Sequence, residues 1–87
     1  MTEIRKTVRL FGDEITLAIS LNGATVTGVR PIRGKDKTMS IVGAVGRQIA
    51  DGKSLAEIGH NATVLQELVW LLFAEQEARN DRNRDHA

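Results

Sequence analysis

The chain has no cysteine and no tyrosine, and it has a single proline and a single tryptophan among its 87 residues. Without cysteine it forms neither disulfides nor thiolate metal sites. Its two histidines, His60 and His86, do not have the spacing of a zinc motif. The sequence therefore predicts no metal and no cofactor. Because a domain this small often needs such support, oligomerisation is the remaining source of added stability.

An excess of one charge and long apolar runs are also missing. The chain has 12 basic and 11 acidic residues, so its net charge of +1 gives no global field that would draw it to nucleic acid or to a membrane. The longest apolar stretch, residues 68–74, is far shorter than the roughly 20 residues of a membrane span. Residues 1–6 lack the apolar core of a signal peptide. We expect a cytoplasmic protein without membrane contact.

The N-terminal third carries alternating apolar and polar residues, the pattern of half-buried strands. The alternation covers residues 4–10 and 15–21. Gly12-Asp13 predicts a tight turn between these two strands. Asn22-Gly23 follows the second strand and is the strongest short signal for a type I′ hairpin, because both central residues of that turn need positive φ.

A third strand is predicted over residues 24–30 by its β-branched residues. Gly28 is a candidate bulge, and Pro31 limits how far the strand continues inside a sheet. The three strands together form an antiparallel meander.

Capping signals predict three helices after residue 34. Thr38 or Ser40 can cap the first helix, and Gly52 stands where a helix-ending glycine belongs. Ser54-Leu55-Ala56-Glu57 has the spacing of a capping box for a short second helix, which Gly59 would end.

The third helix is opened by a second capping box, Thr63-Val64-Leu65-Gln66. We therefore expect one α+β domain over residues 1–80, in which a three-stranded antiparallel meander is followed by three helices packed on one face. Residues 81–87 form a charged tail that we expect to fray.

The third helix is apolar nearly all round, which leaves more apolar surface than one sheet can cover. Trp70 and Phe73 lie toward a side other than the main apolar stripe. They either complete the core or form an exposed patch that binds a partner or a second copy. We favour self-association, and the interaction residues that we expect are Trp70, Phe73 and Val69.

A basic segment precedes the first predicted helix and is a candidate anion site, because the free N–H groups of a helix N-terminus favour an anion. A solvated loop is the commoner explanation for such a segment. Arg5 and Arg9 would extend the patch if they share its face, but no interleaved aromatics support base stacking. The candidate anion-binding residues are Arg30, Arg33, Lys35 and Lys37.

Gly43-Ala44-Val45-Gly46 resembles the loop with which KH domains clamp a nucleic-acid backbone between two helices. Ala44 and Val45 are not the basic residues usual in that loop, and two capped helices follow where a KH domain returns to a strand. We favour the alternative that these glycines let the first helix pack closely on a neighbour.

The sequence offers few residues that could form a catalytic site. His60 could act as a general base in a cleft, but a lone loop histidine is usually polar surface. No pair of acids has a spacing that fixes it in one site. We therefore expect that the protein is not an enzyme.

The pattern from about residue 13 to 74 resembles the TSCPD domain family. The resemblance rests on the hairpin over residues 15–29, on the helix from Ile41 to Gly52, and on Ser54-Leu55-Ala56-Glu57-Ile58. Asn61-Ala62-Thr63-Val64-Leu65 stands where the family has its naming motif, but the cysteine and proline of that motif are absent. The element order is also similar to that of iron–sulfur scaffold proteins, whose cluster cysteines are missing here, so cluster binding is not implied.

TSCPD domains occur attached to, or beside, cobalamin-dependent ribonucleotide reductases and also as small stand-alone proteins. The resemblance implies a non-catalytic protein-interaction or assembly module, with a role accessory to ribonucleotide reductase as one form of it. Two alternatives stay open, a nucleotide- or nucleic-acid-binding protein that uses the basic loop and a small protein inhibitor of another enzyme. We expect a homo-oligomer, a dimer first, and an unidentified protein partner.

Overall fold

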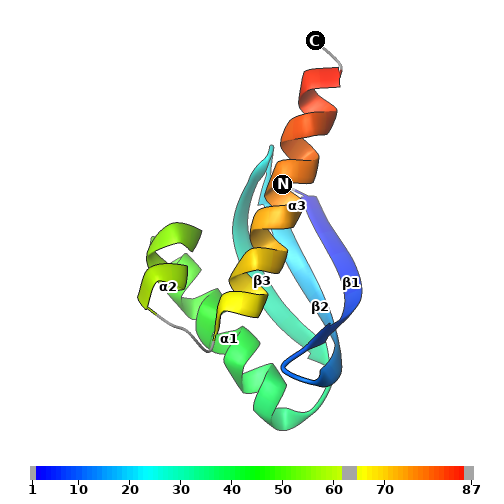
Figure 1. Ribbon diagram of the computed structural model, residues 1–87, viewed down its shortest axis with the longest axis vertical. Coiled ribbons are helices and arrows are strands. Elements are labelled where there is room, and N and C mark those ends of the chain that lie inside the picture. Colours follow the sequence, from blue (N-terminus) through cyan, green and yellow to red (C-terminus); the bar gives the residue numbers. More distant parts are fainter. Residues whose placement is uncertain (1, 62–64, 86–87) are drawn as a thin grey trace.

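The computed structural model of the protein describes residues 2–61 and 65–85. Within them, the strands β1 (Thr2–Leu10), β2 (Asp13–Asn22) and β3 (Thr25–Arg33) precede the helices α1 (Asp36–Ala50), α2 (Leu55–Asn61) and α3 (Gln66–Asp85). Consecutive strands pair antiparallel in the order β1-β2-β3. All three helices lie on one side of this open sheet, and the C-terminal part of α3 extends beyond the ends of the strands (Figure 1). The expected α+β fold is confirmed.

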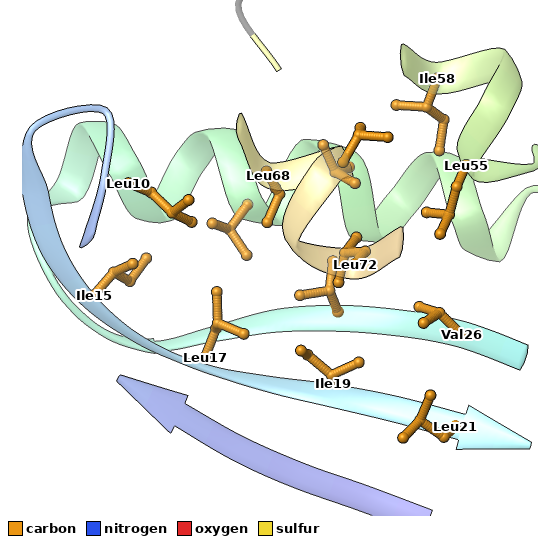
Figure 2. Close-up of a cluster of buried hydrophobic side chains, with 14 residues drawn as sticks. Leu10, Ile15, Leu17, Ile19, Leu21, Val26, Leu55, Ile58, Leu68 and Leu72 are labelled. Carbon is orange, nitrogen blue, oxygen red and sulfur yellow. The ribbon is translucent and has the colours of Figure 1, made fainter. Parts of the chain in front are cut away.

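The core lies between the helices and one face of the sheet. Side chains alternate between the two faces of a strand, so every second residue of β2 points to the helices. Figure 2 shows these side chains directed from the sheet toward α2 and α3. The largest fully buried apolar side chains come from β2, from α1, from α2 and from α3, and they are Ile15, Leu17, Ile19, Leu21, Val42, Val45, Ile58, Leu68, Val69 and Leu72.

Strand β1 places a charged residue on the core face. Ile4 and Val8 of this face are partly buried against the core, and Lys6 lies between them. The Lys6 ammonium forms an ion pair with the carboxylate of Glu75 on α3. Because β1 is an edge strand, the lysine keeps 42% of its side chain in solvent while its charge is paired. The lysine that interrupts the apolar alternation therefore attaches α3 to the sheet edge.

Both hairpin turns lie one residue away from the positions that the sequence predicted. The first turn is Phe11-Gly12, with φ of 53° and 81°, and Asp13 already pairs with Leu10. Phe11 tolerates this left-handed conformation although it is not glycine. Its backbone N–H donates a hydrogen bond to Glu67 Oε2 on α3 at 2.7 Å.

The second turn is Gly23-Ala24, because Asn22 pairs with Thr25 and belongs to the sheet. Gly23 has φ of 63°. A single positive φ at the first central position is the pattern of a type II′ turn, so the predicted type I′ turn at Asn22-Gly23 is wrong. Asn22 is instead the last paired residue of β2.

Strand β3 is longer than predicted and carries two irregularities. The pairing register with β2 shifts beside Ser20 and again beside Thr16, so the bulge predicted near Gly28 is confirmed. Pro31 lies inside the strand and pairs with Leu17. An edge strand tolerates proline where its missing N–H faces solvent. The bulge also brings both Val26 and Val29 to the buried face.

Helix α1 begins at Asp36 and has no side-chain cap, since Lys35 holds the N-cap position. Neither Thr38 nor Ser40 caps it. The helix is continuous through Gly43 and Gly46, so the KH-type loop is wrong. A Cβ atom at Gly46 would lie 2.2 Å from the carbonyl oxygen of Val29. Close packing of α1 on β3 therefore explains this glycine.

The capping box of α2 is confirmed. The backbone N–H of Ser54 donates to Glu57 Oε2 at 3.0 Å, and the N–H of Glu57 donates to Ser54 Oγ at 3.2 Å. Gly59 does not end the helix, which continues to Asn61. A Cβ atom at Gly59 would lie 3.1 Å from Cγ1 of Val69, so close packing of α2 on α3 outweighs the low helix propensity of glycine.

The predicted second capping box includes Thr63 and Val64, which lie outside the described residues. Helix α3 continues to Asp85, well into the expected tail. Fraying of residues 81–87 stays a prediction.

Candidate interaction surfaces

Trp70 lies on α3 with 68% of its surface accessible, and it is the one large apolar side chain of the described residues that is exposed. Phe73 is partly buried and packs against the core. Val69 is 1% exposed and lies within the core. The expected group of Trp70, Phe73 and Val69 is therefore corrected, because Val69 faces inward beside Leu68 and only Trp70 is fully available to a partner.

Small and polar residues surround Trp70 on the outer side of α3. Gln66, Ala74 and Ala78 are four residues before, four after and eight after it, and all three are exposed. Residues at this spacing lie above one another on one side of a helix. We call Gln66, Trp70, Ala74 and Ala78 the Trp70 stripe.

Polar contacts with the sheet fix how α3 is rotated about its axis. Glu67 accepts its hydrogen bond from the β1–β2 turn, and Glu75 pairs with the lysine of β1. Gln76 Oε1 accepts a hydrogen bond from the backbone N–H of Val26 in β3 at 3.3 Å. Because these contacts reach all three strands or their turns, α3 cannot turn Trp70 inward without breaking them.

A cavity of about 230 Å³ lies beside the inner side of α3. Phe73 and Gln76 of α3, Val26 of β3 and Ile49 of α1 are among the residues that line it. Phe73 thus faces this cavity rather than the outer surface, which separates it from Trp70.

The four basic residues of the predicted anion site are divided between two places. Arg30 and Arg33 belong to β3 and face away from the helices, since they pair with Ala18 and Thr16. Lys35 and Lys37 lie at the start of α1.

Carboxylates already occupy the N-terminus of α1. Asp36 is in its first turn. Asp13 of β2 accepts a hydrogen bond from Thr38 Oγ1 at 2.9 Å and forms an ion pair with Lys35 at 3.2 Å. The Thr38 hydroxyl and the nearby Lys35 and Lys37 hold the pKa of Asp13 below its ordinary value of 3.8. An external anion at this helix end would meet two negative charges, so the geometry does not favour the predicted site there.

The arginines of β3 instead share a face with those of β1. Arg5 pairs with Ala18, which pairs in turn with Arg30 on the other side. The expectation that Arg5 extends the basic patch thus agrees with the register. Sequence reasoning missed Glu3, Thr7 and Thr16 on this face, because only the register of both hairpins shows which residues lie side by side.

Other candidate features give no site. His60 is exposed on α2. Among the side chains that the structure describes, those of residues 2–60 and 65–78, no three histidine or acidic groups lie close enough together to hold a metal ion. No helix in the described part of the chain is both long and apolar enough to cross a membrane.

A scan against models of known protein families finds no match for this chain, and searches of curated proteins and of solved structures find none either. The resemblance to the TSCPD family therefore stays a prediction.

Proposed function

We propose that the protein is a non-catalytic interaction module that docks through the Trp70 stripe, first with a second copy of itself. The observation that carries the proposal is the 68% exposure of Trp70 beside a well-buried core. Leaving a tryptophan in water forgoes about 1.5–3 kcal/mol or more of burial energy. Tryptophan is also the residue most enriched among the anchors of protein interfaces.

The Trp70 stripe is complementary to itself. It carries one large side chain, and the alanines Ala74 and Ala78 follow one and two turns later. Two α3 helices packed antiparallel about a two-fold axis can place Trp70 of each copy over the alanines of the other. Such an interface uses the same surface on both subunits, which is the commonest way that soluble proteins dimerise.

Self-association can be measured through the mass and through the tryptophan itself. We expect a mass of twice 9.5 kDa by sedimentation equilibrium. Because Trp70 is the single tryptophan of the chain, its emission should shift to shorter wavelength as the concentration rises.

Trp70→Ala should weaken the dimer by at least about 30-fold, the effect of losing an interface anchor. Arg47→Ala, at an exposed position of α1, is the matched control and should leave the mass unchanged. A wild type that stays at 9.5 kDa, with tryptophan emission independent of concentration, would reject the dimer.

A protein partner other than a second copy is tested by capture with the tagged wild type and with Trp70→Ala. Ribonucleotide reductase is the partner that the sequence resemblance suggests. If the reductase is retained by the wild type and lost by Trp70→Ala, the accessory role and the stripe are both supported. If both proteins retain it equally, the stripe is not its docking surface.

A further inference from the structure

The face of the sheet that carries no helix is polar and rich in arginine. Strand alternation places Arg5 and Arg9 of β1 and Arg30 and Arg33 of β3 on this face, because their register partners on β2 are the residues that point away from the core. All four arginines are exposed. We call this set the arginine face. Two acids, Glu3 and Glu14, share it.

Arg30 crosses the central strand. Its Nη2 lies 3.0 Å from Glu3 Oε1, although Arg30 is on β3 and Glu3 is on β1. The side chain therefore extends over β2. Ala18 lies between Arg5 and Arg30 in the register and is 0% exposed although it faces away from the core, which agrees with coverage by these long side chains.

Arg5, Arg9 and Arg33 have no ion-pair partner among the described residues. Beside them, the hydroxyls of Thr7 and Thr16 lie 2.9 Å apart. One of these hydroxyls donates to the other, and the second keeps its proton for an anion. Thr16, Ala18 and Ser20 of the central strand are small and do not obstruct its approach, whereas Glu14 lies opposite Arg9 at one end of the face. The cations thus line both edge strands, with a polar surface between them.

We propose that the arginine face binds the phosphate backbone of double-stranded nucleic acid. Guanidinium groups bind phosphate through paired hydrogen bonds. The arginines lie on both edge strands of a sheet whose central strand has 10 residues and is about 33 Å long. Cations spread over such a surface suit a linear polyanion better than a single small anion.

The composition of the face favours nucleic acid over an acidic protein. Protein interfaces have an apolar core, whereas protein–DNA interfaces are more polar and more positively charged. The outward positions of β1 and β2 carry no large apolar side chain. They also carry no aromatic residue, so contact with phosphate, without base stacking, is the mode that the face supports. This face is opposite the helices and is independent of the Trp70 stripe.

Glu3 acts as an internal competitor of the phosphate. Its carboxylate holds the Arg30 guanidinium, which must be released before it can bind another anion. Removal of the Glu3 charge should therefore strengthen binding. This gain cannot come from misfolding, so it separates a binding role from a structural one.

The test is fluorescence anisotropy with a labelled DNA duplex of arbitrary sequence. If Arg5, Arg9, Arg30 and Arg33 each contact one phosphate, the affinity should fall about 150-fold between 50 mM and 200 mM salt. Arg5→Gln with Arg33→Gln should leave two contacts and reduce this fall to about 12-fold. Glu3→Gln should raise the affinity by up to about 5-fold, the worth of an exposed ion pair.

The matched control is Arg47→Gln with Lys53→Gln, which removes the same charge from exposed positions of the helical side. We expect this control to bind almost as the wild type does. Absence of duplex binding at low salt overturns the proposal. So does a control that loses as much affinity as the arginine-face variant, since overall charge would then explain the binding. Equal displacement of the duplex by poly-glutamate would assign the face to an acidic protein instead.

Discussion

The two faces of the sheet are built from the same three strands but have opposite chemistry. On β2, Ile15, Leu17 and Ile19 face the helices and are at most 1% exposed, while Thr16 and Ser20 face away and are partly exposed. The charges on the outer face are mostly arginines, although the chain as a whole has a net charge of only +1. A near-neutral composition can therefore include a strongly segregated surface, and only the pairing register shows it.

The largest expected loss of stability comes from a substitution on the core face of the sheet. Leu17→Ala removes a side chain that is 0% exposed at the centre of the sheet. We expect a loss of about 2–5 kcal/mol in the free energy of unfolding, because a cavity is left. Urea denaturation followed by circular dichroism measures it.

The control for Leu17→Ala is its neighbour on the other face. Thr16→Ala removes one hydroxyl and with it the exposed hydrogen bond to Thr7. This change should lower the free energy of unfolding by about 1 kcal/mol or less. Equal losses for the two variants would contradict the division of the sheet into a packed and an open face.

A smaller loss of stability is expected from a substitution where α1 packs on β3. Gly46→Ala places a methyl group 2.2 Å from the Val29 carbonyl oxygen, which belongs to the backbone and cannot move aside easily. We expect a loss of about 1–3 kcal/mol. Thermal unfolding of the variant measures it.

Gly43→Ala is the matched variant, because a Cβ atom there meets nothing within 4 Å. In a helix interior this change should stabilise by up to about 1 kcal/mol. If both variants stabilise the protein, the close packing of α1 on β3 is wrong.

The smallest effect concerns Asp13, at the end of the sheet where α1 begins. Because its pKa is lowered in the folded state, Asp13 contributes stability above the ordinary pKa of 3.8, and this contribution is lost as the pH falls through the lower, folded pKa. Asp13→Asn should therefore be less stable than the wild type at neutral pH. The difference between the two should shrink in acid.

Urea midpoints of the two proteins at neutral and at acid pH test this prediction. A difference that stays constant with pH would assign the role of Asp13 to hydrogen bonding without charge.

Local patterns were enough to predict the order of the elements. Alternation placed the first two strands, Gly52 placed the end of α1, and the box of Ser54 and Glu57 placed the start of α2, because each of these signals acts within a few residues. The turns were misplaced by one residue, since Asn22 fits a type I′ turn as well as it fits the end of a strand. Pro31 fits a strand only because β3 is at the edge, which is a property of the whole sheet.

The candidate surfaces could be identified only from the tertiary structure. Residues 68–74 of α3 are all apolar, so the sequence could not distinguish the outward Trp70 from the inward Val69. Contacts with residues more than 50 positions away, such as the bond from Phe11 to Glu67, decide the rotation of the helix. The arginine face likewise depends on pairing between Arg5 and Arg30 through a third strand.

The Lys6 ion pair has a consequence for the solubility of the sheet. β1 pairs with β2 without any register shift, so its free edge is regular and could accept a strand from another molecule. A strand added there would cover the Lys6 ammonium, and inward-facing lysines of this kind oppose such pairing. At the other edge, Pro31 and the two register shifts of β3 oppose pairing with a strand from another molecule. Each edge of the open sheet is thus protected against aggregation by a different residue.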